Sequence, residues 1–204
     1  RVSGDIFTLL TPYETKEDIY EITSTLQERM KNFRGIRYEF AFGVYLIEDI
    51  TEPVRLMEDK ASVARCSIKN NAIENVAFYD IEMQESLENK KFIENNMKAA
   101  LENEEFLIYL QPKFSISKEV IVGYEALVRW NHPELGLIPP FKFIPILEEN
   151  GFISKLDYYV WECVCNVLGD WKERGFKMLP ISINVSRVHL NNDTFLDVLD
   201  SLVE

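Results

Sequence analysis

Two β-type runs joined by a short polar turn constrain the fold of this chain more than any other feature. The runs cover 106–114 and 120–130, with five residues between them. Such runs on either side of a short turn are typical of a β-hairpin. A turn centred within those five residues sets Gln111 opposite Tyr124 or Glu125. The sequence therefore predicts a hairpin whose register is known to within one residue.

The elements expected after the hairpin predict the start of an α/β barrel. Helical patterns cover 141–150 and 154–174, a strand-like run covers 179–186, and a helical pattern resumes up to the end. A hairpin followed by helix, strand and helix suits the opening of such a barrel, whereas eight strands need about 200–250 residues. We expect a partial TIM-like barrel over 106–204.

The first 80 residues predict a separate and smaller α/β module. Strand-like and amphipathic helical segments alternate along it, at 5–11, 14–33, 38–47, 53–70 and 75–79. This β-α-β-α-β order is typical of a two-layer module. The strongly polar stretch 81–105 carries a thin apolar stripe, which predicts either a helix connecting two domains or the first helix of the second domain.

The charge of the chain excludes one class of partner. It has 34 acidic and 22 basic residues, a formal net charge of −12. Binding to duplex phosphates needs clustered basic residues, so we expect no duplex nucleic acid as a partner. A small nucleotide is still admissible, because a bound cation neutralises its charge locally.

Cysteine usage and hydropathy predict a cytoplasmic protein. Three cysteines (Cys66, Cys163 and Cys165) are too few for a disulfide framework, and we expect reduced thiols rather than a metal site. No apolar run approaches the roughly 20 residues of a membrane span. The chain begins without Met and is expected to be the interior of a longer protein. Any membrane tether is expected to lie in other segments of that protein.

Side-chain alternation places an acid and a guanidinium on one face of the second hairpin strand. Glu125, Leu127 and Arg129 share this face, opposite an apolar face that ends in Trp130. Glu125 and Arg129 are about 13 Å apart at roughly 3.3 Å per residue, which disfavours an ion pair. The spacing suits a ligand whose metal is held by one residue and whose phosphate is held by the other.

A second polar face comes from the strand expected at 179–186, where Asn184 lies between two serines. A buried polar face needs partners, because each unpaired group costs about 1–3 kcal/mol. Four side chains can converge on one cavity, namely Gln111, Glu125, Arg129 and Asn184. Carboxylate and amide oxygens suit Mg²⁺ or Mn²⁺. The alternative stays open that the Glu lies at a solvated strand edge and that the Asn belongs to a turn.

The same residues carry a resemblance to a known family. The segments Phe106–Pro112 (FLIYLQP), Gly123–Trp130 (GYEALVRW) and Ser182–Ser186 (SINVS) resemble, in order, the opening of EAL domains, the cyclic di-GMP phosphodiesterases. The resemblance implies a TIM-like barrel that hydrolyses cyclic di-GMP to linear pGpG with Mg²⁺ or Mn²⁺.

The resemblance also implies roles for individual residues. Glu125 is the expected catalytic residue and first metal ligand, and Asn184 is the expected second ligand. Gln111, Leu127 and Arg129 are the expected contacts to the dinucleotide. The family's other metal-binding acids, general base and lysine come from later strands. We therefore expect that this chain by itself is not a competent hydrolase.

The start of the chain resembles the second half of a GGDEF domain, the diguanylate cyclase family. Arg1–Phe7 (RVSGDIF) stands where that family has Arg-x-Gly-Gly-Asp-Glu-Phe. The strand with Ala41–Val44 and the helix with Asp59–Ala61 follow in the family's order.

Two departures from the GGDEF signature imply a degenerate cyclase. Ser3 replaces the first glycine, where the turn approaches the nucleotide with no side chain in the way. Ile6 replaces the second acid, whereas Gly4 and Asp5 are kept. The resemblance admits GTP as a ligand of this module and a homodimer as its assembly.

Two functions remain open at this stage. One is a phosphodiesterase with a regulatory, degenerate GGDEF domain, which the intact 125–129 motif and Asn184 favour. The other is a catalytically inactive cyclic di-GMP receptor or protein-interaction scaffold, which the degenerate first module favours.

Overall fold

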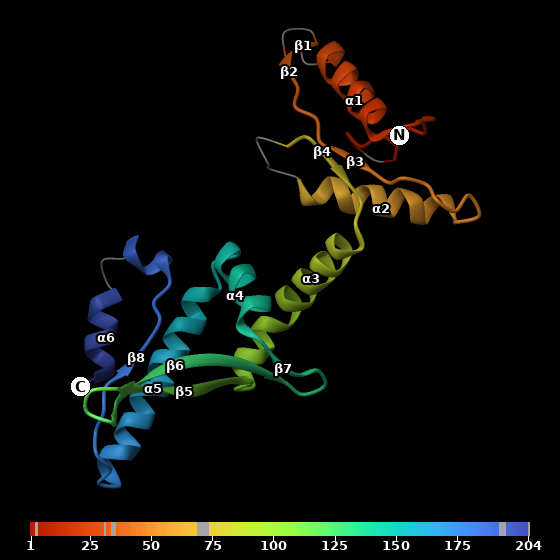
Figure 1. Cartoon of the computed structure of the whole chain (residues 1–204). Coiled ribbons are helices and arrows are strands. Elements are labelled where there is room, and N and C mark those ends of the chain that lie inside the picture. Colours follow the sequence, from red (N-terminus) through yellow and green to blue (C-terminus); the bar gives the residue numbers. More distant parts are fainter. Residues whose placement is uncertain (3, 31, 34–35, 69–73, 192–194, 204) are drawn as a thin grey trace. The chain divides into compact units, whose positions relative to one another are not determined.

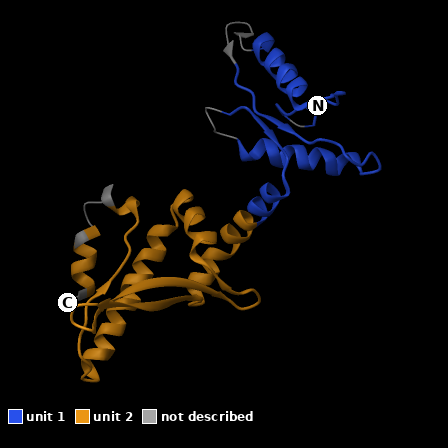
Figure 2. Cartoon of the chain, viewed as in Figure 1, with its two compact units in different colours: residues 1–88 blue, residues 89–204 orange. Residues whose placement is uncertain are grey.

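The computed structural model describes residues 1–204 except 3, 31, 34–35, 69–73, 192–194 and 204. The chain divides into two compact units, residues 1–88 and residues 89–204 (Figure 2). Helix α3 (Ile81–Glu102) contributes its first residues to unit 1 and the remainder to unit 2. Among the described residues, no helix combines the length and the apolar character needed to cross a membrane.

Unit 1 is built around a parallel strand pair joined by a helix (Figure 1). Strands β3 (Phe42–Val44) and β4 (Val76–Phe78) pair directly, and α2 (Val54–Ser67) connects them and packs on both. A crossover helix is the usual connection between parallel strands. Helix α1 (Lys16–Met30) and the short antiparallel pair β1 (Asn32–Phe33) and β2 (Ile36–Arg37) precede this β-α-β unit.

The prediction of a strand at residues 5–11 is wrong. Ile6 is assigned a single bridge, its carbonyl accepts a hydrogen bond from the Val2 N–H at 3.0 Å, and the other described residues of the segment lie in no strand. The side chains of Phe7 and Leu10 are 70% and 81% exposed. A strand needs a neighbour for its backbone groups, and none of the described strands runs beside this segment.

Close packing of α2 on β3 depends on a glycine. A Cβ atom at Gly43 would lie 2.0 Å from the carbonyl oxygen of Ala61. That distance is far inside van der Waals contact, so only a residue without a side chain lets the helix approach the strand this closely.

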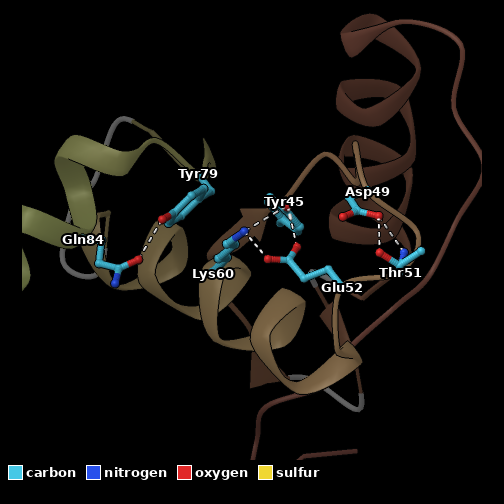
Figure 3. Close-up of polar contacts among 7 residues, drawn as sticks. All are labelled: Tyr45, Asp49, Thr51, Glu52, Lys60, Tyr79 and Gln84. Atoms are coloured by element: carbon cyan, nitrogen blue, oxygen red, sulfur yellow. Dashed lines mark hydrogen bonds and ion pairs between the residues drawn. The ribbon is translucent and has the colours of Figure 1, made fainter.

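A polar cluster anchors the same helix (Figure 3). Lys60 of α2 donates to Glu52 and, at 3.1 Å, to the Tyr45 hydroxyl, which itself donates to Glu52 at 2.7 Å. The ammonium also lies 4.5 Å from the centroid of the Tyr45 ring. The hydrogen bond between Lys60 and Glu52 is the main cause that raises the pKa of Lys60. The same bond is the main cause that lowers the pKa of Glu52. The cluster ties α2 to β3 and to the connection between them.

Unit 2 is a four-stranded sheet centred on one long strand. Strand β6 (Val120–His132) pairs along one edge with β5 (Phe106–Ser115) in an antiparallel hairpin. At its other edge, β7 (Gly136–Ile138) pairs with the end of β6 and β8 (Ile181–Ser182) pairs parallel to its middle. Besides the larger part of α3, unit 2 contains α4 (Pro140–Glu149), α5 (Ile153–Glu173), the 3₁₀ helix η1 (Arg187–Asn191) and α6 (Phe195–Val203).

The core of unit 2 lies between one face of the sheet and the helices α3, α4 and α5 (Figure 1). Trp130 and Phe106 from the hairpin are almost fully buried against Phe143 of α4 and Trp161 of α5. Ala126 is also buried, and Val128 packs against the same cluster. The apolar face predicted for this strand is therefore confirmed at Ala126, Val128 and Trp130, whereas Val122, predicted on the same face, is 41% exposed. The chain has a mixed α/β fold.

The strand expected at 179–186 is much shorter than predicted. Only Ile181 and Ser182 pair with β6. Beyond them, side chains of α5 bind the backbone in place of a neighbouring strand: Trp161 donates to the Asn184 carbonyl and Asp157 accepts from the Ser186 N–H. These bonds satisfy the same backbone groups that a ladder would, so the polar-apolar alternation does not extend the strand.

Candidate functional site

The hairpin is confirmed, and of the two partners predicted for Gln111, Tyr124 and Glu125, the structure places Glu125 opposite it. Ser182 of β8 is the register partner of Glu125 at the opposite edge of β6. The three side chains therefore form one row across three strands, on the sheet face opposite the core. Directly opposed side chains have Cβ atoms about 4.5–5.5 Å apart, so their oxygens are within reach of a single ligand.

A lysine that the sequence analysis did not single out contacts this row. The Lys113 ammonium lies 3.7 Å from Glu125 Oε2 and donates to the Ser182 hydroxyl at 2.7 Å. Ser182 in turn donates to the Tyr124 carbonyl at 3.2 Å. The two-residue side-chain period of strands could have placed Lys113 on this face, because Lys113 follows Gln111 by two positions on the same strand.

Arg129 and Leu127 lie further along the same face. The Arg129 guanidinium donates to the Val128 carbonyl at 2.8 Å and lies 5.8 Å from the Tyr109 ring centroid. Leu127 is the register partner of Tyr109. Among the described residues, no ion pair joins Arg129 to Glu125. This agrees with the separation expected from the positions of these two residues along the strand.

Asn184 lies two residues beyond β8 and outside the strand ladder. Its backbone carbonyl accepts a hydrogen bond from Trp161 at 3.4 Å, and the residue is exposed. The sheet register therefore brings Gln111, Glu125 and Ser182 together, whereas the position of Asn184 depends on α5.

The donor set of this face suits a hard divalent cation. Glu125 offers a carboxylate, and Gln111 and Asn184 offer amide oxygens, which is the chemistry that Mg²⁺ and Mn²⁺ prefer. Within the described part of the chain, no three His, Cys, Asp or Glu residues form a group able to hold a metal. Mg²⁺ commonly uses one or two carboxylates and keeps several waters, so a site with one protein carboxylate is compatible with it.

A buried pair that sequence reasoning missed lies beside the Asn184 segment. His189 is 2% exposed, and its Nε2 lies 3.0 Å from Asp157 Oδ2. Burial raises the pKa of Asp157, against the lowering effect of the Ser186 N–H and of His189. A cavity of about 440 Å³ opens next to the pair and is lined by Glu148, Ser186, Arg187 and Val188.

The described residues of the degenerate signature at the start of the chain, Gly4 and Asp5, lie in an exposed turn. Ser3 lies outside the described residues. Gly4 has a φ of +48° in a turn where the Arg1 Nε donates to its carbonyl at 2.7 Å. Asp5 is exposed.

Comparison with known proteins shows the family to which this chain belongs. The family model described as "EAL domain" matches residues 94–204, which is more than half of the chain. The chain therefore belongs to the EAL domain family.

Three relatives illustrate the extent of the similarity. The bifunctional diguanylate cyclase/cyclic di-GMP phosphodiesterase MucR of Pseudomonas aeruginosa is 24% identical over 202 residues, 97% of this chain and 30% of MucR. The cyclic di-GMP phosphodiesterase PdeR of Escherichia coli is 37% identical over 98 residues, 48% of this chain and 14% of PdeR. A solved structure described as "PaMucR Phosphodiesterase, c-di-GMP complex" is 28% identical, with a TM-score of 0.51 over 54% of this chain and 45% of that one. The matches thus cover less than half the length of each relative.

Proposed function

We propose that the gene product containing this chain hydrolyses cyclic di-GMP to linear pGpG through a site on the β5–β6–β8 face, with Mg²⁺ or Mn²⁺. The observation that carries the proposal is the row formed by Gln111, Glu125 and Ser182, with Arg129 further along the same face. The activities named for MucR and PdeR support it. So does the cyclic di-GMP complex of the similar solved structure.

The proposed roles follow from the chemistry of each side chain. Glu125 and Asn184 would hold the cation, which when bound would supply an activated water and neutralise charge developing on phosphorus. Arg129 binds a phosphate, because its planar guanidinium suits bidentate contact. Gln111 donates to the dinucleotide through its amide, and Leu127 gives the apolar contact for a base. Glu125 is the catalytic residue because it contacts the reacting centre through the cation.

We also propose a tandem organisation for the chain. Residues 1–80 are the C-terminal part of a degenerate GGDEF domain, 81–105 are a connecting helix, and 106–204 are the first part of a TIM-like EAL barrel. The match to MucR supports this arrangement, because it spans 97% of the chain and so includes the first segment. The GGDEF part is regulatory, with GTP as its candidate ligand and a homodimer as the candidate assembly. A cytoplasmic location, with the protein tethered to a membrane through other segments, stays a prediction.

A second candidate function is a catalytically inactive cyclic di-GMP receptor or interaction scaffold. The observation that favours it is the Lys113 ammonium beside Glu125. A resident positive charge replaces part of the electrostatic role of a cation toward a phosphodiester, but it does not generate a hydroxide nucleophile.

Chromatography of cyclic di-GMP incubated with the full gene product separates these functions. Parallel samples contain Mg²⁺, Mn²⁺ or a chelator. We expect pGpG in the metal-containing samples and none with the chelator. Cyclic di-GMP that stays intact but is bound, as measured by equilibrium dialysis, would identify a receptor. Absence of both turnover and binding would leave a scaffold.

A further inference from the structure

The segment that carries Asn184 is held by side chains of α5 rather than by the sheet. Trp161 Nε1 donates to the Asn184 carbonyl at 3.4 Å. Two residues further on, the Ser186 N–H donates to Asp157 Oδ2 at 3.1 Å. His189 Nε2 lies 3.0 Å from the same carboxylate oxygen. Two side chains of α5 therefore bind the backbone at Asn184 and two residues after it, and His189 binds the same Asp157 carboxylate.

The side chains of Trp161 and His189 are closely packed in the core. Trp161 and His189 are 1% and 2% exposed. The His189 ring lies 4.9 Å from the Trp161 ring centroid, 5.3 Å from that of Tyr158 and 5.9 Å from that of Phe195. Close-packed interiors resist displacement of a side chain, so these two side chains cannot shift without opening the core.

Both polar partners of the Asp157 carboxylate belong to the segment that follows Asn184. A buried carboxylate is costly unless it is paired and hydrogen-bonded, and Asp157 Oδ2 has both the Ser186 N–H and His189 as partners. Its two contacts fall after Asn184, and the Trp161 contact falls at Asn184 itself.

We propose that Asp157, His189 and Trp161 are positioning residues that fix Asn184 for binding of the divalent cation at Glu125. The proposal rests on the proposed function only in taking Asn184 as a cation ligand. Asp157 acts through the backbone at Ser186, His189 holds the carboxylate, and Trp161 holds the Asn184 carbonyl. Residues that orient metal ligands typically change metal affinity by 10- to 100-fold when replaced.

Mn²⁺ titration of the full gene product, followed by the electron paramagnetic resonance signal of free Mn²⁺, tests this role. Asp157→Asn is expected to raise the Mn²⁺ Kd by about tenfold or more. Asp170→Asn is the matched control: it makes the same chemical change on the same helix, where the acid pairs with Arg174. The control is expected to leave the Kd unchanged.

A double-mutant cycle separates positioning from general stability. Asn184→Ala removes the ligand itself, so Asp157→Asn in that background is expected to weaken Mn²⁺ binding no further. A merely structural role predicts the same loss in both backgrounds, and that result would overturn the proposal. An unchanged Kd in folded Asp157→Asn would overturn it as well.

Trp161→Phe keeps the proposal testable if Asp157→Asn does not fold. It removes the indole N–H and keeps an aromatic ring, and it is expected to raise the Mn²⁺ Kd in the presence of Asn184 only. Wild-type protein that hydrolyses cyclic di-GMP without measurable Mn²⁺ binding would refute the positioning role and leave the proposed function intact. Mn²⁺ binding that follows the cycle, without hydrolysis, would refute the phosphodiesterase and leave the positioning role standing.

Discussion

The Lys113 ammonium lies 3.7 Å from the Glu125 carboxylate. It donates a hydrogen bond to the Ser182 hydroxyl, and Ser182 is the register partner of Glu125 on β8. The proposed divalent cation would also have to contact the Glu125 carboxylate. Lys113 is therefore expected to compete with that cation for Glu125.

Replacing Lys113 with Ala is expected to tighten Mn²⁺ binding. The pair is about half exposed, and exposed ion pairs contribute roughly 0.2–1 kcal/mol, so the Kd should fall by up to about fivefold. Calorimetric titration of the full gene product without nucleotide measures this change. Lys118→Ala, in the hairpin turn, is the matched control and should have no effect. Weaker binding in Lys113→Ala would show that Lys113 supports the cation site instead of competing for it.

Gly123 is expected to be intolerant of a side chain. Its added Cβ would lie 2.8 Å from the Pro180 carbonyl oxygen, which accepts the Tyr124 N–H at 2.9 Å where β8 joins β6. Gly123→Ala should lower the free energy of unfolding by about 1–3 kcal/mol. Gly169→Ala, on α5 with nothing within 4 Å, should raise it by about 0.5–1 kcal/mol. Urea denaturation that gave both variants the same sign would contradict the close contact at Gly123.

Tyr159 gives unit 2 a pH-dependent contribution at alkaline pH. Its hydroxyl donates to the Phe106 carbonyl at 3.1 Å, and burial raises its pKa from 10.0 to about 12. A raised folded-state pKa means that this contribution is complete below pH 10 and is lost as the pH rises through about 12. The difference in unfolding free energy between wild type and Tyr159→Phe should therefore shrink above pH 10. A difference that stayed constant through this range would place Tyr159 in solvent.

The three cysteines are expected to differ in reactivity. All are free thiols; Cys66 is exposed, whereas burial raises the pKa of Cys163 and of Cys165. Because the thiolate is the nucleophile, iodoacetamide should modify Cys66 several-fold faster than the other two. Peptide mass spectrometry gives the rates, and protein unfolded in urea is the control in which the difference disappears. Equal rates in the folded protein would contradict the packing of α5.

Local patterns predicted the hairpin and its two faces. A two-residue side-chain period and a short turn restrict the register of a hairpin, so Gln111 could be placed opposite Tyr124 or Glu125 from the sequence, and the structure selects Glu125. The same period separated buried Trp130 and Ala126 from the polar face that carries Glu125 and Arg129.

Features that depend on distant partners were beyond the sequence pattern. The run at 5–11 has the composition of a strand but has no strand beside it among the described elements. The run at 179–186 loses its ladder because Asp157 and Trp161 bind its backbone. The contact between Asp157 and His189 joins residues 32 positions apart, a spacing that carries no periodic signal.

Turnover of cyclic di-GMP by wild type and Glu125→Ala, compared in the full gene product with Mn²⁺, tests the central claim most directly. Supporting residues around a metal cost about 10- to 100-fold, so loss of the ligand itself should lower the rate by more than about 100-fold. The melting temperature should hardly change, because the ion pair of Glu125 is partly exposed. Glu134→Ala, an exposed acid in the turn after β6, should keep the wild-type rate. Full activity in Glu125→Ala would contradict the assignment of this face as the site.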